Sequence, residues 1–239
     1  MNIVYHNTAN FFNATNYSRL NREAGALLHE EFALNCYVKL PFFFNDDLFA
    51  ILKTEVLRIF EQHSRRRDFN MKHEQNTPRH LSTVSGVAVA EHSQLIPALY
   101  RDSQLIEFLY GIAGTQVHLV PDPFDRHVIH RLDKIGDVHG GHLDTYAFAF
   151  AIFIETPPEE AGGCLEFVPH SMEISDLNTS LAKRVGHNVG DCYFMKTNKS
   201  VHRVLPLSEE VKRTNLIFTY ADDETINIDI SYSSQPLYG

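Results

Sequence analysis

Beyond Gly114 the chain consists of short segments rich in β-branched and aromatic residues, separated by turn residues. These segments span residues 116–120, 126–132, 147–155, 164–168, 190–196 and 214–221. Many short strands divided by turns are typical of antiparallel sheets that fold back on themselves, since parallel strands need long crossover connections. The pattern therefore predicts a mainly β core, built as a double-stranded β-helix (jelly roll).

The first half of the chain has helical periodicity. Apolar residues recur at helical spacing in residues 16–29, 45–63 and 93–112, and a strand is expected at 32–40. Residues 64–92 are polar and partly basic, so they are predicted to form a loop or lid. No linker rich in Gly, Ser or Pro divides the chain. We expect an α+β fold in one domain, 1–239, with about 1–114 as helical support and lid region and about 115–239 as jelly-roll core, flanked by the N-terminal helices.

Composition narrows the classes of function. The formal net charge of −9 disfavours a non-specific nucleic-acid binder, which needs a basic surface. The three cysteines lack metal-ligand spacing and are interpreted as reduced thiols. Residues 1–7 do not resemble the start of a signal peptide, and the longest apolar run, 147–154, is too short to span a bilayer. These features predict a cytoplasmic protein without nucleic-acid or membrane partners; a homodimer remains possible.

The second half also carries a pattern of metal-binding residues. His142 and Asp144 are separated by one residue, so in extended chain both side chains point to the same side. His202 follows sixty residues later, after another predicted strand. Two imidazoles and one carboxylate form the facial triad of non-heme Fe(II) oxygenases, which leaves coordination positions open. In a chain with 14 histidines a lone His-x-Asp could be a chance pair of surface residues, but the joint pattern with a distal His is much more specific.

Arg213 lies eleven residues past the distal His. Its guanidinium is permanently charged and can hold a carboxylate through two parallel hydrogen bonds. An open metal site beside such a group is what an oxygenase with a 2-oxo acid co-substrate needs. The sequence therefore predicts His142, Asp144 and His202 as metal ligands and catalytic residues, and Arg213 as the contact for the co-substrate.

These motifs resemble those of the Fe(II)/2-oxoglutarate-dependent dioxygenase superfamily. Residues 161–171, Ala-Gly-Gly-Cys-Leu-Glu-Phe-Val-Pro-His-Ser, are similar to a hairpin of that superfamily, and 190–194, Gly-Asp-Cys-Tyr-Phe, to the strand before its distal His. Arg213-Thr214-Asn215 departs from the commoner Arg-x-Ser. The resemblance implies Fe(II) as cofactor, and 2-oxoglutarate and O2 as co-substrates. It also implies that 2-oxoglutarate is decarboxylated to succinate while the substrate loses a hydrogen to the oxidant formed on the metal.

A narrower resemblance is to the small enzymes that hydroxylate or halogenate free amino acids, and residues 139–150 carry it. In the halogenases of this group Gly replaces the carboxylate ligand and chloride takes its place. This chain has Asp144, so hydroxylation is implied. Group members that act on lysine tend to have an acidic residue directly after the metal motif. Thr145 stands there in this chain, which disfavours lysine.

Substrate contacts are predicted at His139, Asp125 and Thr145. His139 could equally be a solvated loop residue, and turn chemistry alone could account for Asp125. Arg131 is the second candidate for binding 2-oxoglutarate, because alternate residues of strand 126–132 should face the interior. We expect a hydroxylase of a small amino acid or related metabolite. The alternatives are an oxygenase acting on a protein residue or a lipid, and a non-catalytic metal-binding jelly roll.

Overall fold

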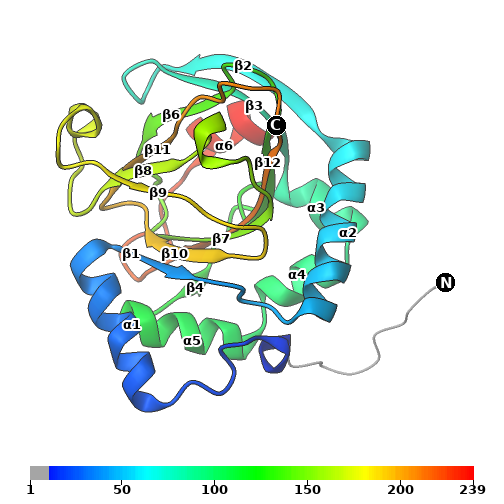
Figure 1. The fold of residues 1–239 in the computed structure, drawn as a ribbon, viewed down its shortest axis with the longest axis vertical. Helices are drawn as coiled ribbons and strands as arrows, with labels where there is room; N and C mark the ends of the chain where they lie inside the picture. Colours follow the sequence, from blue (N-terminus) through cyan, green and yellow to red (C-terminus); the bar gives the residue numbers. More distant parts are fainter. Residues whose placement is uncertain (1–10) are drawn as a thin grey trace.

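In the computed structural model, which describes residues 11–239, one strongly curled antiparallel sheet forms the centre (Figure 1). The interpretation of residues 1–7 concerns a stretch outside the described residues. The strand order is β1-β10-β7-β12-β5-β3-β6-β11-β8-β9, with β2 paired to β3 and β4 paired to β12. The strands are β1 Tyr37–Leu40, β2 Arg65–Met71, β3 Thr77–Val84, β4 His118–Leu119, β5 His127–Leu132, β6 Val138–His142, β7 Phe148–Glu155, β8 Leu165–Val168, β9 Lys183–Val185, β10 Cys192–Lys196, β11 Val201–Val204 and β12 Arg213–Ala221.

Strand β3 joins the two halves of the sheet. Its residues Ser82–Val84 pair with β5, whereas Arg79 and His80 pair with β6. One half therefore holds β1, β10, β7, β12 and β5, and the other holds β6, β11, β8 and β9. Two antiparallel layers connected in this way confirm the predicted jelly roll.

Helices cover the outer face of the larger half, as Figure 1 shows. They are α1 Arg22–Asn35, α2 Asp46–His63, α3 Gly86–His92, α4 Leu95–Tyr100 and α5 Ser103–Ala113. The C-terminal helix α6 Ser231–Tyr238 lies instead inside the curl of the sheet, beside β3. Short 3-10 turns are η1 Phe11–Ala14, η2 Glu159–Ala161 and η3 Ile174–Asn178. Side chains of Asn21, Asn45 and Asp102 accept hydrogen bonds from backbone N–H groups of the first turns of α1, α2 and α5. Such caps fix where a helix begins because those N–H groups have no partner within the helix. Over residues 11–239 no helix combines the length and the apolar character of a membrane span.

Strand β7 separates the two apolar cores. Phe148, Phe150 and Ile152 belong to the core between the sheet and the helices. Ala149, Ala151 and Phe153 belong to the core between the two halves of the sheet. Both faces of β7 are thus buried, which explains why this strand is a continuous apolar run.

The predicted loop or lid at 64–92 is wrong. Residues 65–84 form the β2–β3 hairpin, and 86–92 form α3. The polar character of this stretch has two causes: β2 is an edge strand with one exposed side, and the buried face of β3 includes the cation of Arg79. Strands β6, β9 and β11 and helix α6 were also not predicted.

Candidate metal centre and its pocket

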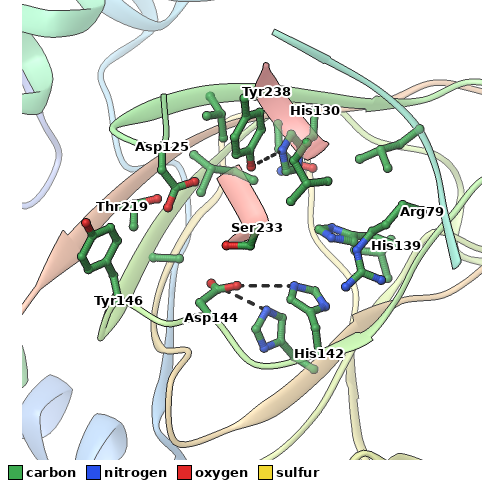
Figure 2. Close-up of a pocket in the computed structure, with 18 of the residues that line it drawn as sticks. Arg79, Asp125, His130, His139, His142, Asp144, Tyr146, Thr219, Ser233 and Tyr238 are labelled. Atoms are coloured by element: carbon green, nitrogen blue, oxygen red, sulfur yellow. Dashed lines mark hydrogen bonds and ion pairs between the residues drawn. The ribbon is translucent and has the colours of Figure 1, made fainter. Parts of the chain in front are cut away.

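The three predicted metal ligands lie together in the structure (Figure 2). His142 ends β6 and lies opposite His202 of β11, its register partner, and Asp144 follows in the next loop. The Nε2 atom of His142 is 3.5 Å from Oδ1 of Asp144, and Nε2 of His202 is 4.0 Å from Oδ2. One ligand atom from each residue lies within 4.8 Å of the others. Antiparallel pairing of β6 with β11 therefore brings distant parts of the sequence to one ion-sized site.

The hydrogen bonds of the two imidazoles fit metal binding. His142 Nδ1 donates to the carbonyl of Gly140 at 2.8 Å, and His202 Nδ1 donates to that of Ser200 at 2.9 Å. A carbonyl can only accept, so each ring has a proton on Nδ1, which leaves Nε2 as the nitrogen that can bind a metal. Burial, and then His202 nearby, lower the pKa of His142 well below its usual value. Two neutral imidazoles and a carboxylate suit Fe(II), whereas structural zinc usually takes a fourth protein ligand.

Arg213 points into the same pocket from β12. Its side chain is 5% exposed, and its guanidinium forms no hydrogen bond or ion pair with any of residues 11–239. The guanidinium carbon lies 5.3 Å from the ring centroid of Phe153. Burial lowers the pKa of Arg213 to about 10, so the group stays charged near neutral pH. A buried cation without a partner is costly, and an anionic ligand removes that cost.

Arg131 does not reach this pocket, which corrects the prediction for it. On β5 the side chains of Val128, His130 and Leu132 line the pocket, and Arg131 lies on the opposite face. Its guanidinium bonds Glu61 at 2.6 Å and Glu155 at 2.9 Å. The expectation that alternate residues of this strand face the interior was sound, but the other set of residues does so.

The three predicted substrate contacts all line the pocket. The ring of His139 stacks on that of His142, with centroids 4.2 Å apart, and its buried Nε2 has no hydrogen-bond partner in the described chain. Thr145 Oγ1 lies 2.6 Å from the hydroxyl of Tyr232. Their roles toward a substrate stay predictions, but their places are compatible with them.

Asp125 lies on the far side of the pocket, beside Thr219 and Tyr238 (Figure 2). Burial, and then the charges of Asp144 and Asp122, raise its pKa well above the usual value. A cation placed next to Asp125 would offset this and stabilise the carboxylate. The Tyr238 hydroxyl also lies 2.9 Å from Nε2 of His130, whose pKa burial lowers to about 3.

Two parts of the pocket were missed in the sequence. Helix α6 contributes Ser233 and Tyr238 to the wall, and Figure 2 shows both side chains facing the cavity. Arg79, 1% exposed, and Glu74 line it from the β2–β3 hairpin. The alternation of Arg79, Leu81 and Thr83, all buried, was the available signal for Arg79, but the basic character of the stretch suggested a solvated surface.

Comparisons with solved structures place the fold. A non-heme alpha ketoglutarate dependent epimerase, SnoN from nogalamycin biosynthesis, superposes with a TM-score of 0.67 at 17% identity, covering 84% of this chain and 84% of that one. A 2OG-Fe(II) oxygenase family oxidoreductase from Burkholderia pseudomallei gives 0.62 at 17% identity, over 85% and 93%. HygX from Streptomyces hygroscopicus, solved with nickel, 2-oxoglutarate and hygromycin B, gives 0.59 at 14% identity, over 92% and 95%. At these identities the likeness shows the fold alone.

Sequence comparison gives the family. No curated protein matches the chain. The sequence model of the Halogenase D family matches residues 20–236, which include the metal triad, Arg213 and the pocket residues from the hairpin and the start of α6. The match spans most of the chain and agrees with the predicted resemblance. The chain therefore belongs to the Halogenase D family, and its fold is the one seen in solved Fe(II)/2-oxoglutarate oxygenases.

Proposed function

We propose that this enzyme hydroxylates a small amino acid, or a related metabolite, and decarboxylates 2-oxoglutarate to succinate in the same reaction. The observation that carries the proposal is the charge distribution of the pocket. Arg79 and His139 lie on one side and Asp125 on the other, with Asp144 and His142 between them (Figure 2). A substrate with an anionic and a cationic end would satisfy both sides and present its middle to the metal.

Two buried nitrogen atoms lie where the anionic end of such a substrate would bind. Arg79 and His139 are register partners on β3 and β6, and both have a buried nitrogen without a hydrogen-bond partner in residues 11–239: Nε of Arg79 and Nε2 of His139. Burial lowers the pKa of Arg79 to about 10, so it remains a cation near neutral pH. A buried unpaired donor costs about 1–3 kcal/mol, which a substrate carboxylate recovers.

The residues around the metal site would have separate roles in the reaction. His142, Asp144 and His202 would hold Fe(II), and Arg213 would bind the distal carboxylate of 2-oxoglutarate through its guanidinium fork. When bound, the iron and 2-oxoglutarate supply the oxidising power that removes a substrate hydrogen. Helix α6 forms part of the pocket wall, where it would limit water entry and so protect a reactive site from side reactions. Because Asp144 keeps a carboxylate at the metal, hydroxylation is the favoured outcome over halogenation.

Two other functions fit less well. A protein-residue or lipid hydroxylase would need an open groove, whereas α6 closes this pocket on one side. A non-catalytic metal-binding jelly roll would not need to retain the full triad together with an unpaired buried Arg213.

The test is an anaerobic titration of the Fe(II)/2-oxoglutarate complex with a panel of amino acids, followed by turnover in oxygen. A true substrate should perturb the weak charge-transfer absorption band, accelerate succinate formation and gain one oxygen atom by mass spectrometry. Asp125→Asn should weaken the binding of amino acids with a cationic side chain more than the binding of neutral ones. A panel in which no amino acid changes the spectrum or the succinate rate would exclude the proposed substrate class.

A further inference from the structure

Glu74 lies at the turn of the β2–β3 hairpin and extends into the pocket. Its backbone N–H donates to the carbonyl of Met71, at 3.1 Å, within the turn. The carboxylate of Glu74 forms an ion pair with Nη2 of Arg79 and is 16% exposed. A carboxylate thus lies directly beside the cation that we assign to the substrate carboxylate.

The guanidinium of Arg79 is only partly satisfied by the protein. Its Nη1 already donates to Thr77 Oγ1 at 3.0 Å and to the carbonyls of Pro78 and Gly140, at 3.0 and 3.3 Å. Nη2 bonds Glu74, and Nε has no partner in the described chain. Nε and Nη2 form the side of the guanidinium that binds a carboxylate through two parallel bonds. A ligand carboxylate at this edge would therefore come to lie next to Glu74.

We propose that Glu74 binds the α-ammonium group of the substrate while Arg79 binds its α-carboxylate, so that the pair selects α-amino acids over acids that lack the amine. The proposal rests on the proposed function and specifies its substrate class further. Three acidic side chains line the pocket among the described residues: Glu74, Asp125 and Asp144. Asp144 is assigned to the metal and Asp125 lies across the pocket, which leaves Glu74 beside Arg79.

The charges explain both the attraction and the exclusion. An α-amino acid carries its ammonium and carboxylate on one carbon, so its zwitterion can align head to tail with the Arg79–Glu74 pair without adding net charge. An acid without the amine would bring an uncompensated negative charge next to Glu74 in a buried site, which is unfavourable. Selectivity of this kind comes from repulsion of the wrong ligand as much as from attraction of the right one.

Calorimetric titration of the anaerobic Fe(II)/2-oxoglutarate complex tests the proposal. The ligands are two pairs that differ only in the α-ammonium group: L-ornithine with 5-aminopentanoate, and L-lysine with 6-aminohexanoate. Wild-type protein should prefer the amino acid of at least one pair by about 10- to 100-fold, the effect of one charge-assisted contact. Glu74→Gln should abolish this preference. It should lower the affinity for the amino acid and leave the affinity for the amine-free acid unchanged or higher.

Asp68→Asn is the matched control, because Asp68 is a carboxylate of the same hairpin that bonds Arg66 and His80 outside the pocket. Asp68→Asn should leave the affinities for both ligands of each pair as in the wild type. Glu74→Asp, which keeps a carboxylate, should retain part of the preference for the amino acid. If Glu74→Gln lowered the affinity for both ligands of a pair equally, Glu74 would only position Arg79, and the proposal would be overturned. A wild-type protein that binds both ligands of each pair equally well would also overturn it. Failure of the proposed function is distinct: no amino acid of the panel would then be hydroxylated.

Discussion

Arg213 and Arg131 make a matched pair for testing how the co-substrate binds. They lie on neighbouring strands, since Arg131 is the register partner of Thr214, but they point to opposite faces of the sheet. Arg213→Lys keeps the charge in the pocket and removes the fork. The loss should be about 1.5–3 kcal/mol, the range for hydrogen bonds to charged groups, and hence about a 10- to 100-fold higher apparent KM for 2-oxoglutarate.

Arg131→Lys should behave differently, because its partners Glu61 and Glu155 are outside the pocket. The Glu61 side chain is 62% exposed, so that pair contributes at most about 1 kcal/mol, and the less exposed pair with Glu155 adds to it. Arg131→Lys should therefore lower the melting temperature, by about 2–4 °C for each kcal/mol lost in a chain of this length, and leave the 2-oxoglutarate dependence unchanged. Succinate formation is measured against 2-oxoglutarate at saturating substrate, with a thermal melt of each variant. An unchanged KM in Arg213→Lys, or an equal rise in Arg131→Lys, would refute the assignment.

Two further predictions concern the metal ligands and acid stability. His142→Ala, Asp144→Ala and His202→Ala should each lose tight Fe(II) binding and nearly all succinate formation while keeping the circular dichroism of the wild type; a variant that retains most of its rate does not carry a ligand. Burial lowers the pKa of His130 to about 3 and that of His187 to about 2, so below pH 6.5 the unfolded chain takes up protons that the folded chain does not. As the pH falls from 7 to 5, each of these two histidines should therefore lower the free energy of unfolding by about 2 kcal/mol, which urea denaturation measures. A free energy of unfolding that does not change over this range would contradict burial of the rings in their neutral form.

The sequence predicted those elements whose apolar pattern reflects packing. Strands β7 and β12 and helix α2 bury large aliphatic and aromatic side chains in the two cores, and their predicted positions agree with the structure to within a few residues. The grouping of His142 with Asp144 was also predictable, since their one-residue spacing places both side chains on the same side of an extended chain.

Two of the missed strands, β3 and β6, carry polar residues that line the pocket where a strand would normally carry apolar ones. Strand β6, Val-His-Gly-Gly-His, presents His139 and His142 to the pocket, and β3 presents Arg79. A Cβ at Gly140 would come within 2.9 Å of backbone atoms of Pro78, so this strand needs glycine for close approach to β3. Polar residues and glycine together remove the alternating apolar signal by which strands are predicted.

The family name and the residue at position 144 point to different reactions, and the proposal of hydroxylation depends on Asp144. Its two carboxylate oxygens face the two imidazoles, at 3.5 Å from His142 Nε2 and 4.0 Å from His202 Nε2, so as a carboxylate the group would fill a ligand position and bring a negative charge to the metal. Both properties should exclude chloride from the metal. Wild-type enzyme should therefore give only hydroxylated product even in high chloride, followed by the chlorine isotope pattern in mass spectrometry. Asp144→Gly removes ligand and charge together and should mainly lose activity, because substrate position also determines which group is transferred. Chlorinated product from the wild type would show that Asp144 is not a metal ligand during turnover.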